Sequence, residues 1–217
     1  MTALSAIETR LRPHSLAVMG GFHAKDDPAL PEGCKTLLLI GPAEPGFWPH
    51  FTRQPEWRDG QPDPMDRWSQ RVLTALATGL GATAVFPFGG PPWHPFYQWA
   101  LRSGAAWESP LRLLVHAQMG LFASYRGALA LPQRIALPAP PAKPCDSCPD
   151  KPCLTACPVQ ALGADGYNLP ACHGFLDQDA GQDCMNMGCA ARRACPLSLA
   201  YARLPEQSAY HMRQFHK

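Results

Sequence analysis

The hydrophobic residues in the first part of the chain follow two patterns, helical spacing and short continuous runs. Apolar residues at every third or fourth position predict three helices, at residues 2–12, 64–79 and 94–103. The second is the most strongly marked. Asp63 before it favours the N-cap position, and Pro64 favours the first helical turn.

The continuous apolar runs predict β-strands between these helices. The predicted strands cover residues 15–19, 36–40, 83–86, 111–115 and 120–131. We expect Gly20 and Gly21 to end the first strand. The resulting order of strands and helices indicates a layered α+β or α/β domain.

A proline-rich stretch at residues 138–144 is the clearest boundary, because such a sequence is stiff and extended. It separates a predicted first domain, residues 1–137, from a cysteine-rich module, residues 145–200. Residues 201–217 form a C-terminal tail. We expect residues 197–217 to form a helix and tail that pack back on the first domain.

The composition and charge of the chain argue against several classes of partner and location. The net charge is +2, too close to zero to indicate a nucleic-acid partner. No apolar run approaches the roughly 18–20 residues of a transmembrane helix, so no membrane partner is expected. The first residues lack the basic and apolar regions of a signal peptide. Together these features predict a cytoplasmic protein.

Eight of the nine cysteines lie within one short stretch. They are Cys145, Cys148, Cys153, Cys157, Cys172, Cys184, Cys189 and Cys195. The first four read C-x2-C-x4-C-x3-C-P, close to the bacterial C-x2-C-x2-C-x3-C-P run that binds [4Fe–4S] clusters. Eight thiolates suffice for two such clusters, so the spacing predicts a redox protein.

In two-cluster ferredoxins the fourth cysteine of such a run ligates the other cluster. This crossed arrangement predicts one ligand set of Cys145, Cys148, Cys153 and Cys195. It predicts a second set of Cys157, Cys172, Cys184 and Cys189. Each Cys-Pro step is also expected to open a short helix, at residues 158–162 and 197–201.

Zinc sites and disulfides fit these cysteines less well. Four-cysteine zinc sites usually show paired C-x2-C knuckles, and only Cys145 and Cys148 form one here. Four disulfides would need an oxidising compartment. The remaining cysteine, Cys34, is expected to be a small buried hydrophobic residue.

The predicted first domain has no nicotinamide fingerprint and no phosphate-binding loop. Residues 86–99 combine aromatic residues, prolines and glycines. Trp93 and Phe96 in this segment are candidate walls of a cofactor pocket, although a packed loop explains them slightly better. A second segment, residues 116–127, carries a histidine at one end and Arg-Gly at the other.

Together these segments resemble a family of vitamin B12-processing proteins, the CblC proteins, and their relatives the epoxyqueuosine reductases. The residues that carry the resemblance are His116, Gly120, Leu121-Phe122, Arg126-Gly127, the strand 128–131 and the Asp-Pro-Met-Asp of 63–66. Epoxyqueuosine reductases also place a two-cluster ferredoxin module after this domain. They carry a helical-repeat tail for tRNA, of which we expect no counterpart here, and CblC proteins lack clusters.

The resemblance implies a nitroreductase-like α+β domain that binds cobalamin, followed by a small ferredoxin-like module with two [4Fe–4S] clusters. It also implies that His116, Gly120, Arg126 and Gly127 lie at the edge of the corrinoid. The chain would then be an oxidoreductase that receives electrons from a donor protein or reductant and passes them singly to cobalamin.

Two alternatives remain. The chain could be a non-catalytic ferredoxin-like carrier without cobalamin. It could also be a truncated tRNA-modifying reductase, against which the near-neutral charge argues.

Overall fold

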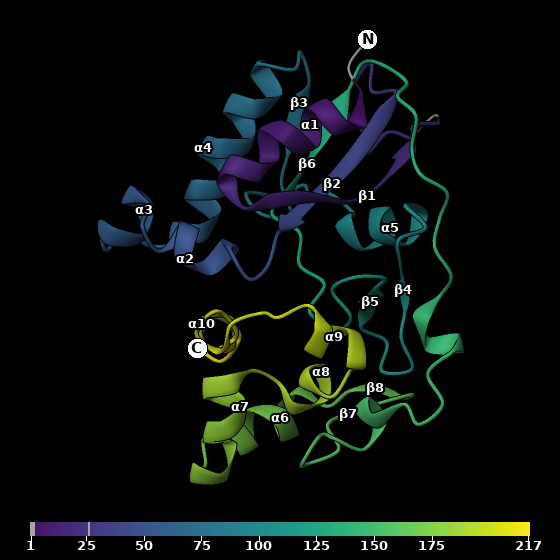
Figure 1. The fold of residues 1–217 in the computed structure, drawn as a ribbon. Helices are drawn as coiled ribbons and strands as arrows, with labels where there is room; N and C mark the ends of the chain where they lie inside the picture. Colours follow the sequence, from purple (N-terminus) through teal and green to yellow (C-terminus); the bar gives the residue numbers. More distant parts are fainter. Residues whose placement is uncertain (1–2, 26) are drawn as a thin grey trace. The chain divides into compact units, whose positions relative to one another are not determined.

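The computed structural model describes residues 3–25 and 27–217 and has a mixed α+β fold that divides into two units (Figure 1). Unit 1 comprises Met1–Ala105 and Ser124–Pro141. Unit 2 comprises Ala106–Ala123 and Ala142–Lys217. The chain therefore enters unit 2, returns to unit 1 and enters unit 2 again.

The second entry into unit 2 falls between Pro141 and Ala142, inside the predicted linker 138–144. The first entry is not marked by any proline-rich stretch. The boundary predicted at residues 138–144 places residues 106–123 in the first domain, whereas the structure places them in unit 2. This segment contributes apolar side chains to the unit that contains the cysteine cluster.

Unit 1 contains a four-stranded antiparallel sheet of order β1-β2-β6-β3. The strands are β1 (Leu16–His23), β2 (Thr36–Pro42), β3 (Thr83–Val85) and β6 (Gly127–Leu131). Every residue of β2 and β6 is buried, which explains why these strands are continuous apolar runs rather than alternating ones.

Short and long helices surround this sheet. They are α1 (Leu4–Leu11), η1 (Arg12–His14), α2 (Phe47–Phe51), α3 (Pro55–Arg58), α4 (Pro64–Thr78) and α5 (Phe96–Arg102). α4 packs on β3 and β6, while α1 and α5 pack on β1. Figure 1 shows α1 beside α4, and Arg10 Nη1 of α1 donates a hydrogen bond of 2.7 Å to the carbonyl of Gly79.

Several predicted boundaries in this region are corrected by the structure. β1 does not end at Gly20-Gly21, because its register shifts between Val18 and Gly21 and the strand continues to His23. A bulge absorbs the glycines without ending the pairing. Of the predicted strand 120–131, only Gly127–Leu131 is extended. Residue 2 of the predicted helix 2–12 lies outside the described residues.

The start of α4 is where the sequence predicts it, with Asp63 at the N-cap position and Pro64 after it. Pro64 is the first helical residue. Asp63 adopts a left-handed conformation with φ of 49°, and its side chain makes no capping hydrogen bond. A proline at the first position and an amphipathic face therefore define this helix without a side-chain cap.

Unit 2 consists of short elements joined by tight turns. The strands are β4 (Ala106–Glu108), β5 (Leu114–His116), β7 (Leu162–Gly163) and β8 (Gly166–Tyr167). The helices are η2 (Pro144–Asp146), η3 (Pro152–Leu154), α6 (Leu169–Leu176), η4 (Asp179–Gly181), α7 (Gln182–Met187), α8 (Ala190–Arg193), α9 (Pro196–Ala200) and α10 (Pro205–Phe215). β4 pairs with β5, and β7 pairs with β8. The predicted strand 111–115 is shifted to Leu114–His116.

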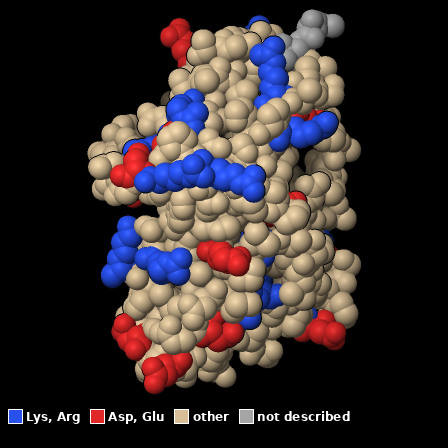
Figure 2. Space-filling model, turned by 60° about the vertical axis from the view of Figure 1, so that its left-hand side comes forward, with Lys and Arg blue, Asp and Glu red and all other residues tan. Residues whose placement is uncertain are grey.

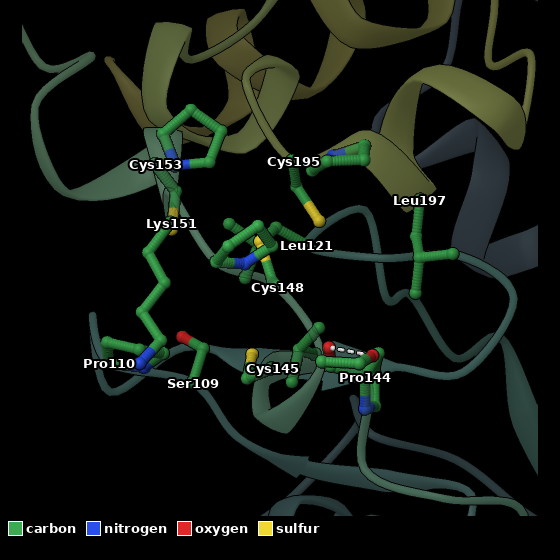
Figure 3. Close-up of a pocket in the computed structure, with 15 residues that line it drawn as sticks. Ser109, Pro110, Leu121, Pro144, Cys145, Cys148, Lys151, Cys153, Cys195 and Leu197 are labelled. Carbon is green, nitrogen blue, oxygen red and sulfur yellow. Dashed lines mark hydrogen bonds between the residues drawn. The ribbon is translucent and has the colours of Figure 1, made fainter.

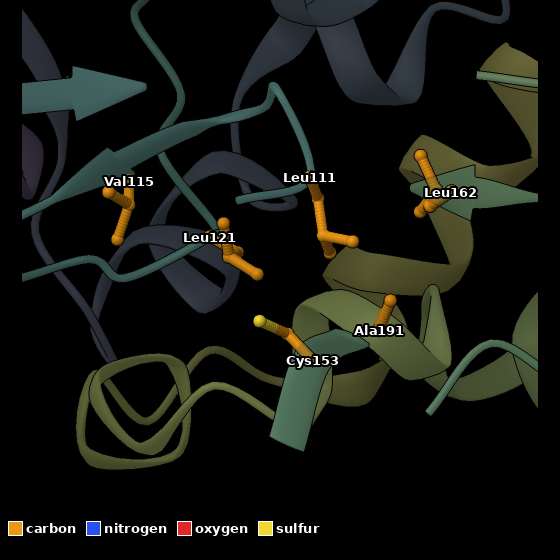
Figure 4. Close-up of a cluster of buried hydrophobic side chains, with 6 residues drawn as sticks. All are labelled: Leu111, Val115, Leu121, Cys153, Leu162 and Ala191. Atoms are coloured by element: carbon orange, nitrogen blue, oxygen red, sulfur yellow. The ribbon is translucent and has the colours of Figure 1, made fainter. Parts of the chain in front are cut away.

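A buried cluster joins the early segment of unit 2 to the cysteine-rich region (Figure 4). Its members are Leu111, Val115, Leu121, Cys153, Leu162 and Ala191. Because three of these side chains come from residues 106–123, that segment forms part of the core of unit 2.

Two helix predictions in unit 2 have opposite outcomes. The Cys195-Pro196 step opens α9, as predicted. The predicted helix 158–162 is absent, because residues 158 and 159 form a turn closed by a hydrogen bond of 3.1 Å from Gln160 N to the Cys157 carbonyl. Gln160 has a φ of 49°, which a helix does not allow.

The C-terminal helix belongs to unit 2. α10 packs on α7, and Met212 of α10 lies in a buried cluster with Leu176 and Cys184. α10 therefore lies beside the cysteines.

The prediction that residues 197–217 pack on the first domain holds for Ser198 and Arg203, which contact Leu121 and Phe122. The structure places all four of these residues in unit 2.

Candidate metal centres

Four cysteines of unit 2 line one cavity, which we call site A. They are Cys145, Cys148, Cys153 and Cys195. The cavity has a volume of about 340 Å³, and the other side chains around it are mostly proline and aliphatic residues, with Ser109, Ser147 and Lys151 as polar members (Figure 3). Cys145 and Cys153 are supplied by η2 and η3, and Cys195 directly precedes α9.

The pKa values at site A show that these thiols influence one another. Burial raises the pKa of the Cys145 thiol, and the neighbouring Cys195 and Cys148 raise it further. Burial also raises the pKa of Cys153, with additional contributions from Cys195, Cys145 and Cys148. A cation bound among these thiols would oppose both effects and favour the thiolate form.

The other four cysteines form a second group, site B, consisting of Cys157, Cys172, Cys184 and Cys189. Burial raises the pKa of Cys172, and the nearby Cys189 and Cys157 raise it further. The pKa of Cys184 is raised by burial and by Cys189. The two groups coincide with the crossed arrangement that the spacing predicts.

The sulfur atoms of site B accept hydrogen bonds from nearby backbone and side-chain groups. Ala161 N donates to Cys157 Sγ at 3.2 Å, and the Tyr167 hydroxyl donates to Cys172 Sγ at 3.2 Å. The backbone amide of Ala190 hydrogen-bonds Cys184 and opposes the rise of its pKa. Hydrogen bonds of this kind stabilise negative charge on a sulfur ligand.

Burial and neighbouring sulfur also raise the pKa of Tyr167 well above its usual range. Its hydroxyl therefore stays protonated near neutral pH and acts as a donor. Cys189 and Cys157 of site B also pack against the buried cluster that contains Cys153 of site A. The same apolar core of unit 2 thus borders both groups.

A zinc ion and a [4Fe–4S] cluster require different arrangements of four thiols. Within the described residues, no group of three or more His, Cys, Asp or Glu side chains can hold one metal ion. A zinc site needs all its sulfur ligands about 2.3 Å from one ion, and hence close together. A [4Fe–4S] cluster binds each thiolate to a different iron, so its four sulfur ligands lie further apart. The four thiols of site A line one mostly apolar cavity.

Two residues of the predicted cofactor edge, His116 and Gly120, lie in unit 2 and make contacts within it. His116 is 2% exposed at the end of β5, and its Nδ1 accepts hydrogen bonds from the Gln118 and Met119 amides at 3.0 and 3.3 Å. Gly120 has a φ of 56°, and a Cβ there would lie 2.4 Å from Ser198 N. Its close approach is to α9.

Arg126 and Gly127, the other half of the predicted cofactor edge, lie in unit 1. The Arg126 guanidinium is buried, pairs with Asp66, and donates to Ser69 Oγ at 3.0 Å. A Cβ at Gly127 would lie 2.6 Å from Leu73 Cδ1. Both residues thus join β6 to α4.

The proposed pocket walls also lie in unit 1 and differ in environment. Phe96 is 7% exposed and packs on Trp99 with ring centroids 5.1 Å apart, as the packed-loop interpretation predicts. Trp93 is 64% exposed. Cys34, expected to be buried, is only partly so.

Sequence reasoning missed Tyr167 and Ala161 as neighbours of the sulfur atoms. A tyrosine five residues before a cysteine carries no recognisable signal, because the contact depends on how β8 turns into α6. The amide of Ala161 became available because the segment after Cys157 is a turn, where a helix was predicted.

No family model matches the chain, and neither curated proteins nor solved structures gave a match. The resemblance to CblC proteins and epoxyqueuosine reductases therefore remains a prediction. Among the described helices, none has both the length and the apolar character needed to cross a membrane.

Proposed function

We propose that the chain is an iron–sulfur electron-transfer protein that holds one [4Fe–4S] cluster at site A and a second at site B. The observation that supports this most directly is the grouping of eight thiols into two sets of four within one unit. Each cluster would supply one-electron chemistry, while the protein supplies ligands, an apolar surround and hydrogen bonds.

The crossed grouping also supports a ferredoxin-like module. Cys195 closes the second run but lies with the first three cysteines, and Cys157 closes the first run but lies with the later ones. A nitroreductase-like first unit, a cytoplasmic location and transfer of electrons to cobalamin are further proposals that rest on sequence and resemblance. If the resemblance holds, the chain is an oxidoreductase.

Iron analysis of single-cysteine variants tests the two-site assignment. Anaerobically reconstituted protein should contain about eight irons per chain, the content of two cubanes. Cys153→Ser at site A and Cys184→Ser at site B should each lower this to about four. Cys34→Ser is the matched control, because Cys34 lies in unit 1, and it should retain about eight.

Zinc in place of iron would contradict the proposal, as would equal loss of iron in the control variant. Loss of all iron in both site variants, with the fold retained, would contradict independent sites. Circular dichroism of each variant establishes that the fold is retained.

The cobalamin proposal has its own test on the reconstituted protein. Hydroxocobalamin is added, unbound corrinoid is removed by gel filtration, and the visible spectrum is recorded. Retained corrinoid that dithionite-reduced protein converts to the cob(II)alamin spectrum would support cobalamin reduction. Full iron content without retained corrinoid would leave the carrier function and reject cobalamin binding.

A further inference from the structure

The two cysteine groups differ in the hydrogen bonds that reach their sulfur atoms. Site B receives donors from Ala161 and from the Tyr167 hydroxyl, each at 3.2 Å, and from the amide of Ala190. At site A, within the part of the chain that the structure describes, the sulfur donor recorded is the amide of Cys153 itself. Site B therefore has the richer set of donors.

The charged side chains near site A and site B do not differ in the way that the hydrogen-bond donors do. Site A has Lys151 in its cavity wall and Lys143 beside Cys145, with Asp146 opposing them. Site B has Arg192 near Tyr167 and Arg193 near Cys184, and Arg193 is paired with an aspartate. Because each group has two basic residues and one acidic residue nearby, the hydrogen bonds distinguish the groups.

Hydrogen bonds to the sulfur atoms of an iron–sulfur cluster are among the factors that set its reduction potential. A reduced cluster carries one more negative charge, so a donor stabilises the reduced state more than the oxidised state. The group with more donors has the more positive potential and is reduced first.

Tyr167 is well placed to provide this effect. It ends β8, and the next residue, Asn168, caps α6 by accepting a hydrogen bond from Ala171 N at 3.1 Å. Because Cys172 is in the first turns of α6, this short connection holds the hydroxyl against its sulfur atom. The hydroxyl is the only side-chain donor to a candidate ligand sulfur recorded among the described residues.

The end of α10 holds the Tyr167 ring. Phe215 stacks on Tyr167 with centroids 6.0 Å apart and on His173 with centroids 4.7 Å apart. His216 fixes this end through Asp177 at 2.9 Å and His173 at 2.6 Å. The C-terminal helix thus positions a donor to site B.

We propose that Tyr167 is a positioning residue whose hydroxyl makes site B the higher-potential centre, so that an electron received at site A passes to site B. This inference rests on the proposed function. The transfer oxidises the centre at site A, reduces the centre at site B, and breaks no bond. The electron reaching site A comes from a low-potential one-electron donor, for which dithionite substitutes in the test.

The test is a redox titration of reconstituted protein followed by electron paramagnetic resonance. Tyr167→Phe removes the donor and keeps the ring. It should shift the site B midpoint to a more negative potential and leave site A unchanged. Phe215→Ala should shift site B in the same direction by a smaller amount, because it loosens the tyrosine ring without removing the hydroxyl.

Variants that keep only one of the two sites show which cluster's midpoint potential Tyr167→Phe shifts. Tyr167→Phe in the Cys153→Ser background, which keeps site B, should show the full shift. In the Cys184→Ser background, which keeps site A, it should show none. Tyr125→Phe is the control, because this buried hydroxyl of unit 1 has no hydrogen-bond partner in the described part of the chain.

The outcomes separate this inference from the proposed function. Protein that binds no iron would overturn the proposed function. Fully loaded Tyr167→Phe protein with unchanged potentials would overturn the inference alone. So would a site A midpoint more positive than that of site B in the unmodified chain. Loss of about four irons from Tyr167→Phe would show that the tyrosine holds site B together, which also overturns the inference.

Discussion

Gly120 lies where a side chain has no room. Its φ of 56° is in the left-handed region, and an added Cβ would lie 2.4 Å from Ser198 N and 2.7 Å from Ser198 Oγ. The same serine accepts a hydrogen bond of 2.9 Å from Leu121 N. This close contact holds the first turn of α9 against the turn after β5, and Cys195 of site A directly precedes α9.

Gly120→Ala should destabilise unit 2 and weaken site A. Gly81→Ala is the matched control, because Gly81 has a similar φ of 61° but no atom within 4 Å of an added Cβ. The control should cost about 1–2 kcal/mol, the cost of a left-handed alanine. Overlap with backbone should add about 1–3 kcal/mol at Gly120.

Thermal unfolding and the rate of iron loss to a chelator measure these two effects. Equal unfolding and iron loss in the two variants would mean that backbone conformation alone matters at Gly120. The contact with α9 would then not support site A.

At the scale of elements, α4 and β6 are joined by a buried polar contact. Arg126, just before β6, pairs with Asp66 and hydrogen-bonds Ser69 of α4. Its guanidinium carbon also lies 5.8 Å from the centre of the Phe88 ring. α4 itself follows directly from the apolar pattern, but this attachment does not, because its partners are 57 and 60 residues apart in the chain.

Arg126→Met should lower the free energy of unfolding of unit 1 by about 2 kcal/mol, the scale for hydrogen bonds to a charged group. Arg134→Met is the control, because Arg134 is exposed, and it should change stability little. Urea unfolding followed by tryptophan fluorescence measures the difference. Unchanged stability together with lost corrinoid binding would instead favour the role at the cofactor edge that the resemblance implies.

At the scale of the whole molecule, the two units are interleaved in the sequence. Residues 106–123 lie between two segments of unit 1 but belong to unit 2, where Leu111, Val115 and Leu121 are part of the buried core. Val115 and Leu121 also line the cavity of site A. A module cut at the proline-rich linker would therefore lack one wall of that site.

A fragment of residues 142–217 should lose the cluster of site A more readily than a fragment of residues 106–217, because only the longer one carries all of unit 2. The measurement is iron content after anaerobic reconstitution, with the full chain as reference. We expect the longer fragment to approach eight irons and the shorter to hold about four or fewer. Equal iron in both fragments would contradict a role for residues 106–123 at site A.

On the face drawn in Figure 2, several basic side chains form one continuous row, while acidic side chains lie in small separate groups among larger uncharged areas. This mixture agrees with the net charge of +2 for the chain.

The sequence by itself determined the features that depend on near neighbours. The buried runs at residues 36–40 and 128–131 became the central strands, and the periodic segment after Pro64 became the longest helix. The cysteine spacing anticipated two groups of four, because residues three to five apart in a tight loop can face a common centre. Iron binding by those groups stays a prediction.

Tertiary structure decided everything that depends on distant partners. It placed residues 106–123 in unit 2, and it brought Ser198 to Leu121 across 77 residues. It also turned Tyr167 towards Cys172 and engaged Arg126 with α4. Local patterns report only which residues prefer burial, a helix or a strand. The partner of each buried or polar group is chosen by the packing of the whole unit.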